Sequence, residues 1–158
     1  MELKTVSEKL ISHPFLEGLR PEHVEKLAAM SCEVHFEKDQ MIFREGDESS
    51  FFYLLLSGKV SLEVPSPGRT WCIQTIGAGQ ELGWSSVVTP VRKQFQARCV
   101  AAGDAIAFDG ARLVRACEED FEFGYHIMRR VLSVVTERLQ ATRLQLLDVF
   151  KPVGAKML

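Results

Sequence analysis

The sequence predicts an α+β domain, mainly β, in which a double-stranded β-helix or jelly-roll barrel is flanked by N-terminal helices and a long C-terminal dimerisation helix. Three patterns predict it: helical apolar spacing over residues 1–30, alternating apolar residues with frequent turn signals over 31–108, and a second helical period over 109–150. We expect residues 151–158 to be a tail. A chain of 158 residues suffices for one such domain with a hydrophobic core.

The composition excludes several classes of protein. Apolar residues make up 46% and charged residues 25%, and the net charge of −2 gives no basic field for nucleic acid. Arginines of the last third, Arg138 among them, alternate with acids, which is typical of a solvated helix face. No apolar run approaches the ~20 residues of a membrane span, and no signal peptide is recognisable. With four separated cysteines, we expect a reduced cytoplasmic protein without a local metal motif.

The N-terminal part predicts two short helices joined by a connector. Apolar residues repeat at helical spacing up to Ile11, and Pro21 opens the second helix, because proline is tolerated in a first turn. Between the two helices, we expect Phe15 and Leu16 to enter the core.

Residues 31–108 predict several short antiparallel strands. Turn signals such as Glu45-Gly46-Asp47 and Ser57-Gly58-Lys59 interrupt the alternating apolar positions at close intervals. Pro65 and Pro67 fit a hairpin tip, where the ladder needs no donor. Glu81 to Ser86, ELGWSS, predict a tight turn followed by the start of a short helix.

Two helices are predicted after the strands. Asp109 can cap a short helix, and Asp120 can cap a long one that runs from about Phe121 to Phe150 before residues 151–154 stop it.

The long helix carries two apolar stripes. Ile127, Val131 and Val134 can face the barrel. The other stripe repeats with spacings of 4, 3, 4, 3, 4 and 3, which is the heptad pattern of a coiled coil. We therefore predict a homodimer through this seam, the alternative being one wide stripe packed within a single domain. The seam consists of Met128, Leu132, Val135, Leu139, Thr142, Leu146 and Val149.

The order of these motifs resembles the cyclic nucleotide-binding domain family. Phe43–Asp47 is similar to its glycine turn, Phe52–Val60 to its hairpin, and Gly79–Gly83 to the motif that leads into its phosphate-binding cassette. The resemblance covers about residues 12 to 150. It implies a non-catalytic regulatory domain that binds a ligand in the cassette, here residues 81–97, and signals through its long helix.

The cassette departs from the family at two charged positions. In the family, a glutamate after the cassette glycine accepts the ribose hydroxyl, and an arginine two residues before a small residue pairs with the cyclic phosphate. Carried over by position, these fall on Trp84 and on Phe95, two residues before Ala97. Losing the cation costs roughly 2–5 kcal/mol and losing the acceptor roughly 1–3 kcal/mol, so micromolar binding falls to millimolar or weaker. We expect no binding of cAMP or cGMP in the family's usual way.

Other residues near the cassette could supply charge or hydrogen bonds. Arg92 and Lys93 are the better cations, although loop cations are more often solvated, and Arg98 points opposite to Ala97 because strand neighbours alternate. Ser85 and Ser86 could donate to an anion or cap the helix. The predicted pocket comprises Glu81, Leu82, Gly83, Trp84, Ser85, Ser86, Arg92, Lys93, Phe95, Gln96 and Ala97.

Two functions remain open. The first is a sensory domain whose aromatic wall suits a flat or hydrophobic molecule, with an unidentified downstream protein partner. The second is a ligand-free homodimer or adaptor whose aromatics fill the old pocket. A haem or redox sensor is less favoured, because no motif brings two of the four histidines or four cysteines together. We expect no enzyme, no metal and no certain cofactor, and no DNA binding, since the chain ends eight residues after Phe150.

Overall fold

The computed structural model describes residues 4–88 and 92–150, which fold in the predicted order of helices, strands and helices. The helices are α1 Val6–Ile11, η1 Pro14–Leu16, α2 Pro21–Ala29, η2 Trp84–Val87, α3 Gly110–Glu119 and α4 Phe121–Val149. The strands are β1 Ser31–Phe36, β2 Met41–Phe43, β3 Phe51–Leu55, β4 Lys59–Ser66, β5 Arg69–Gly77, β6 Glu81–Leu82, β7 Gln96–Ala101 and β8 Gly103–Asp109.

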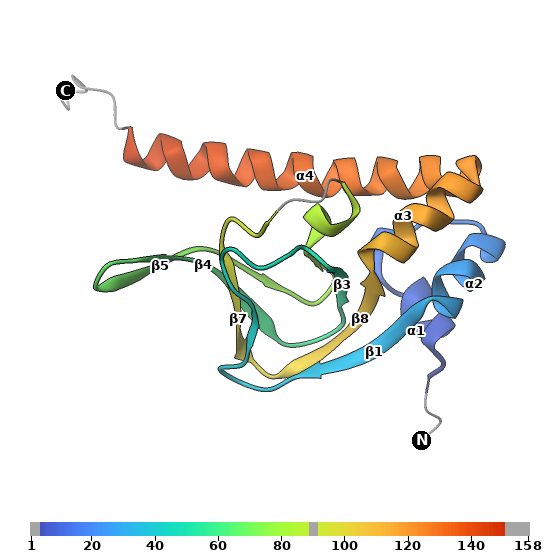
Figure 1. Ribbon diagram of the computed structural model, residues 1–158, viewed down its shortest axis with the longest axis horizontal. Helices are drawn as coiled ribbons and strands as arrows, with labels where there is room; N and C mark the ends of the chain where they lie inside the picture. The colour runs from blue at the N-terminus through green and yellow to red at the C-terminus, as the bar shows by residue number, and fades with distance from the viewer. Residues whose placement is uncertain (1–3, 89–91, 151–158) are drawn as a thin grey trace, which may run out of the picture.

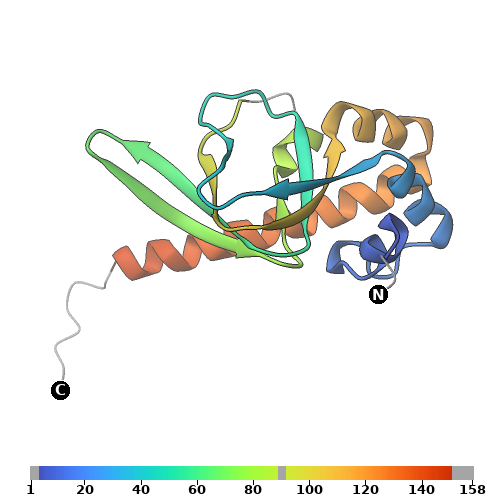
Figure 2. The same ribbon diagram turned by 90° about the horizontal axis from the view of Figure 1, so that it is seen from below.

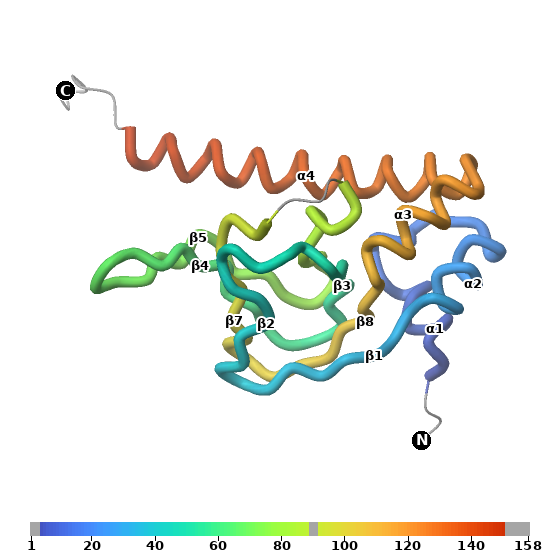
Figure 3. The backbone as a smooth tube through the Cα atoms, in the orientation of Figure 1, coloured from blue at the N-terminus to red at the C-terminus, as the bar shows by residue number. Residues whose placement is uncertain are grey.

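The strands form two four-stranded antiparallel sheets, with the orders β1-β8-β3-β6 and β2-β7-β4-β5. The tube view shows β2 beside β7 and β1 beside β8 (Figure 3). One core cluster, which includes Leu55, Leu62 and Leu82, draws buried side chains from both sheets. The predicted jelly-roll architecture is therefore confirmed, with one correction: its strands pair as two separate sheets and not as one closed barrel.

The predicted helix boundaries agree with the structure. Asp109 accepts a hydrogen bond from the backbone N–H of Arg112 at 3.0 Å, and Asp120 accepts one from that of Phe123 at 3.1 Å, so both caps are confirmed. Helix α4 ends one residue before the predicted end. The predicted stop over residues 151–154 lies outside the described residues.

One stripe of α4 packs on a second core cluster. Ile127, Val131 and Val134 have exposed fractions of 0%, 2% and 5%, which confirms that this stripe faces the domain. The same cluster contains Phe15 and Leu16, which are buried as expected. Figure 1 shows α4 running along the whole molecule, over the N-terminal helices at one end and over the β4–β5 hairpin at the other.

The predicted seam faces away from the domain along most of its length. Leu132, Leu139 and Leu146 have exposed fractions of 64%, 49% and 50%. Met128 is half-buried against the domain's own core, so the outward stripe begins at Leu132. Figure 2 shows the β4–β5 hairpin projecting from the sheets on the same side as the C-terminal half of α4. Within the described residues, no helix is both long and apolar enough to span a membrane.

The turn into η2 depends on Gly83. Its φ of 81° is in the left-handed region, which glycine adopts without the steric strain that a Cβ brings. A Cβ at this position would also clash with the backbone carbonyl of Phe51. The segment after it is a four-residue 3-10 helix, which agrees with the short helix that the sequence predicted after a tight turn.

Replacing Gly83 with alanine tests this double constraint. Gly68 at the hairpin tip is a matched control, because its φ is 76° but no atom lies within 4 Å of an added Cβ. We expect Gly68→Ala to lower the free energy of unfolding by about 1 kcal/mol and Gly83→Ala by roughly 3 kcal/mol, because only the second adds overpacking to backbone strain. Urea unfolding measures both, and equal losses would contradict the proposed clash.

Candidate functional site

The cassette borders a small cavity between η2, the residues before β7 and helix α4. Its volume is about 100 Å³. We call it the cassette cavity, and the described residues that line it are Leu82, Gly83, Trp84, Ser85, Arg92, Lys93, Gln94, Phe95 and Arg138.

Four residues of the predicted pocket do not line the cavity. Ala97 is fully buried in the cluster between the sheets. Successive side chains of a strand point to opposite faces, and that of Ala97 points into this core. The amide of Gln96 donates to Glu63 at 3.0 Å on the opposite face, and the hydroxyl of Ser86 donates to the carbonyl of Gly83 at 2.8 Å. Glu81, the fourth, is not in the lining itself, but its backbone carbonyl accepts a hydrogen bond from Arg138, which is.

Trp84 and Phe95 are both half-buried at the cavity. Trp84 packs against the core cluster beneath α4, whereas Phe95 packs against the cluster between the sheets. The ring centroid of Phe95 lies 5.8 Å from that of Phe43. The two aromatic side chains are thus anchored in different cores and narrow the cavity between them without closing it.

Lys93 is the most unusual group at the site. Its exposed fraction is only 5%, and its Nζ lies 3.3 Å from Ser85 Oγ and 4.3 Å from the centroid of the Phe43 ring. Over residues 4–88 and 92–150, no carboxylate forms an ion pair with it. Burial lowers the pKa of Lys93 to about 8, because the charged amine is desolvated. The expectation of a solvated loop cation is therefore wrong for Lys93.

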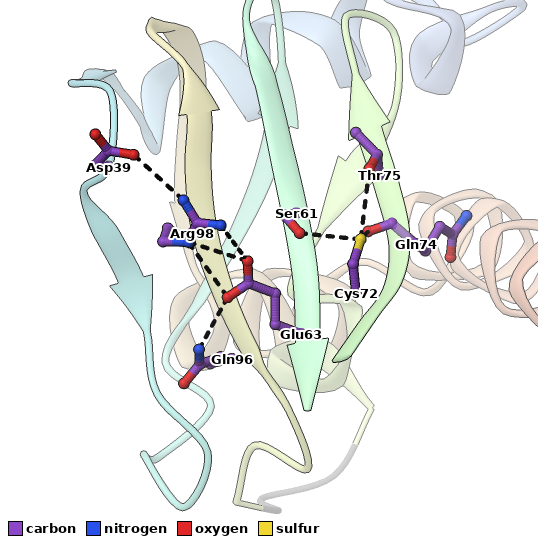
Figure 4. A network of polar contacts seen from close by, with 8 residues as sticks. All are labelled: Asp39, Ser61, Glu63, Cys72, Gln74, Thr75, Gln96 and Arg98. Carbon is purple, nitrogen blue, oxygen red and sulfur yellow. Dashed lines mark hydrogen bonds and ion pairs between the residues drawn. The ribbon is translucent and has the colours of Figure 1, made fainter. Parts of the chain in front are cut away.

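Two neighbouring arginines behave as the sequence suggested. Arg92 is exposed, and its guanidinium donates to the carbonyl of Gly46 at 2.9 Å. Arg98 points away from the cavity and pairs with Glu63 at 2.6 Å and Asp39 at 3.3 Å (Figure 4). Because Arg98 is held by these two carboxylates on the far face of the sheet, it cannot replace the cassette arginine.

The cavity also receives Arg138, which sequence reasoning assigned to a solvated face. That assignment is wrong: Arg138 is half-buried and donates to the backbone carbonyl of Glu81, and burial lowers its pKa. The register of α4 carried the signal. Counting four residues on from Val134 in the domain-facing stripe of Ile127, Val131 and Val134 gives Arg138, one turn beyond the last buried apolar residue.

Ser85 and Ser86 have different partners, and neither caps η2. Ser85 Oγ lies 2.5 Å from Ser49 Oγ and within reach of the Lys93 amine. Ser85 is therefore a polar group of the cavity, whereas the hydroxyl of Ser86 is used within its own turn.

The described residues contain no group of three or more His, Cys, Asp or Glu side chains placed to hold a metal ion. Cys99 and Cys117 are buried, and burial raises the pKa of both thiols, which makes them poor nucleophiles.

The carboxyl of Glu81 is buried beside Arg138. Burial raises its pKa from 4.5 to about 7, and the positive charge of Arg138 opposes this shift. The native protein therefore binds this proton more tightly than the unfolded chain does. As a result, Glu81 makes the free energy of unfolding fall as the pH rises from about 4.5 to about 7.

Substituting Glu81→Gln should remove this pH dependence. Between about pH 5 and about pH 8, we expect the free energy of unfolding of the unmodified chain to fall by on the order of 3 kcal/mol more than that of the variant. Urea unfolding at both pH values measures the difference. Glu137→Gln, a change at an exposed acid that acts on Glu81 from α4, is the control and should keep most of the slope. Parallel pH profiles for Glu81→Gln and the unmodified chain would rule out this titration.

Comparison with known proteins identifies the family. The sequence profile of the cyclic nucleotide-binding domain matches residues 33–120. The CRP-like cAMP-activated global transcriptional regulator of Mycobacterium tuberculosis is 24% identical over 145 residues, which are 91% of this chain and 63% of that protein. The chain thus spans less than two thirds of that relative's length.

Solved structures agree on the fold. A protein of Geobacter metallireducens GS-15 named for cyclic nucleotide binding matches with 29% identity and a TM-score of 0.76, over 86% of this chain and 99% of that chain. A cyclic nucleotide-binding domain of Methylobacillus flagellatus matches with 18% identity and a TM-score of 0.79, over 96% and 86%. The names of these relatives describe a transcriptional regulator and cyclic nucleotide-binding proteins. The chain therefore belongs to the cyclic nucleotide-binding domain family, whose fold is that of a regulatory ligand-binding domain.

Proposed function

We propose that this chain is a non-catalytic sensory domain that does not hold cAMP or cGMP in the family's usual way and that signals through α4. The observation that carries the proposal is the pair Trp84 and Phe95. Both aromatics stand where the resemblance implies the two ligand-binding charges, and both line the cavity.

The size of the cavity supports this reading. Sites for drug-sized molecules have volumes of roughly 300–1,000 Å³, whereas the cassette cavity has about 100 Å³. A purine, a ribose and a phosphate need far more room than this. The aromatic side chains would have to leave their cores to admit a cyclic nucleotide, and each is anchored by packing.

The second candidate is a ligand-free structural or adaptor module, which the small volume also favours. The electrostatics of the cavity favour the sensor instead. A module whose old pocket serves as core gains nothing from a buried amine without a carboxylate partner, because burying an unpaired charge is unfavourable. The buried Lys93 therefore supports a ligand.

Helix α4 is suited to carry the output. Its inner stripe packs on the domain and its outer stripe presents Leu132, Leu139 and Leu146 to solvent. A heptad seam of this kind is stable when it packs on a second helix, and a second copy of the chain supplies one with the same pattern. We therefore propose a homodimer through this seam, with a downstream protein partner still to be identified.

Calorimetry with cAMP and cGMP tests the ligand part of the proposal. For the unmodified chain, we expect dissociation constants of about 1 mM or weaker for both, because the phosphate lacks its arginine and the ribose its glutamate. Submillimolar binding of either nucleotide, abolished by substituting Arg92 or Lys93, would overturn this reading of the cassette.

A double variant provides the positive control. Trp84→Glu with Phe95→Arg restores both charged groups and removes both aromatic walls. We expect cAMP binding to strengthen by about tenfold or more relative to the unmodified chain. Phe51→Arg, at an exposed aromatic outside the cavity, should leave it unchanged.

The mass in solution tests the dimer. We expect light scattering to give twice the mass of one chain, and Leu139→Glu with Leu146→Glu to give the mass of one chain, because two charges would be buried in the seam. Leu144→Glu is the matched control: Leu144 is 64% exposed but lies outside the heptad seam, so this variant should remain dimeric. A single-chain mass for the unmodified protein at high concentration would exclude the proposed seam.

A further inference from the structure

We infer that the cassette cavity binds a small tetrahedral oxyanion of the size of phosphate or sulfate, held by Lys93, Ser85 and Arg138. The inference rests on the proposed function, because it assigns a ligand class to the same cavity.

The charge of the lining is the first argument. Among the described residues that line the cavity, Arg92, Lys93 and Arg138 are cations, and none is an acid. The nearest acid identified at the site is Glu81, whose carboxyl is buried beside Arg138. Because burial raises the pKa of Glu81 to about 7, this carboxyl is protonated in a large fraction of the molecules at neutral pH. Its negative charge therefore neutralises that of Arg138 only in part. The cavity is therefore left electropositive.

The hydrogen-bonding capacity of Lys93 is the second argument. An ammonium group has three N–H donors, and over residues 4–88 and 92–150 its hydrogen-bond partner is Ser85 Oγ at 3.3 Å. The Phe43 ring, 4.3 Å away, attracts the charge but accepts no strong hydrogen bond. A buried cation in this state is stabilised by an anion that accepts hydrogen bonds from its remaining N–H groups.

The two other polar groups can complete such a site. The Arg138 guanidinium has five N–H donors and gives one to the Glu81 carbonyl, which leaves others for an oxyanion. Ser85 shares a hydrogen bond with Ser49 and can turn its proton toward the cavity, because either hydroxyl can be the donor. Of these donors, Lys93 lies in the segment before β7, Ser85 in η2 and Arg138 in α4.

The walls select by size. With a volume of about 100 Å³, the cavity holds on the order of three waters, each occupying about 30 Å³ in the liquid. A tetrahedral oxyanion is comparable, whereas a nucleoside attached to it meets the rings of Trp84 and Phe95. A free oxyanion therefore fits where a cyclic nucleotide does not, and the apolar rings strengthen its electrostatic attraction to the cations by excluding water.

Trp84 provides a direct reporter of binding. The chain has two tryptophans, and Trp71 is 51% exposed on the β4–β5 hairpin, so Trp71→Phe leaves Trp84 as the single fluorophore. In this background, sodium phosphate is titrated at neutral pH against sodium chloride of equal ionic strength, with sodium sulfate and cAMP as further arms. We expect a saturable change in Trp84 emission with phosphate and sulfate, and none with chloride.

Adjacent cations give a matched pair of variants. We expect Lys93→Met to weaken phosphate binding by roughly thirtyfold or more, because it removes the buried charge. Arg92→Met should change it by less than about threefold, since the Arg92 guanidinium already donates to Gly46. In the absence of phosphate, Lys93→Met should have a higher melting temperature than the Trp71→Phe parent. Added phosphate should raise the melting temperature of the parent but not that of Lys93→Met.

The outcomes separate the two proposals. No saturable response in the Trp71→Phe parent, or an equal response in Lys93→Met, overturns the oxyanion site and leaves the cyclic nucleotide proposal standing. Submillimolar cAMP binding that competes with phosphate supports the anion site but overturns the proposed function. If Lys93→Met does not fold, Ser85→Ala replaces it, and unchanged phosphate affinity in that variant counts against the site.

Discussion

The rest of the structure depends on the packing of one apolar stripe of α4 against the sheet β1-β8-β3-β6 and the N-terminal helices. Ile127, Val131 and Val134 are almost completely buried in a cluster that also contains Phe52 and Ile106 of the sheet. Each such side chain contributes about 1.5–3 kcal/mol by leaving water. Because this contact fixes the rotation of α4 about its axis, it also decides which later residues meet the cassette and which face solvent.

The fold could be read from the sequence because its signals are local. A capping aspartate, an apolar period and a glycine turn each depend on residues within a few positions, and Asp109, Asp120 and Gly83 all behave accordingly. The division into two sheets could not be read in the same way. It depends on strand pairs distant in the chain, such as β1 with β8, whose register no short pattern encodes.

The candidate site was only partly accessible from the sequence. Local alternation placed Arg98 on the face opposite to Ala97, as found, whereas Ala97, predicted in the pocket, lies in the core between the sheets. Lys93 was predicted in the pocket but not its burial, and Arg138 was missed, for a common reason: a long cationic side chain on a loop or an amphipathic helix is usually solvated. Their burial follows from three-dimensional packing, because the cavity that both residues line lies between the cassette and α4. Continuing the inner stripe by four residues leads to Arg138. Because Arg138 is charged, the sequence pattern assigned it to the solvent-facing side of the helix.

The position of Arg138 has a consequence for the output of the domain. This residue lies on the cavity wall and is the immediate chain neighbour of Leu139 on the outer stripe. Any coupling between ligand binding at the cavity and self-association through this helix turn is reciprocal. On the proposed function, if ligand binding changes the dimerisation constant by some factor, dimerisation changes the affinity for the ligand by the same factor. The abundance of the protein is then a second input to the sensor, and its ligand threshold is set jointly by ligand and protein concentration.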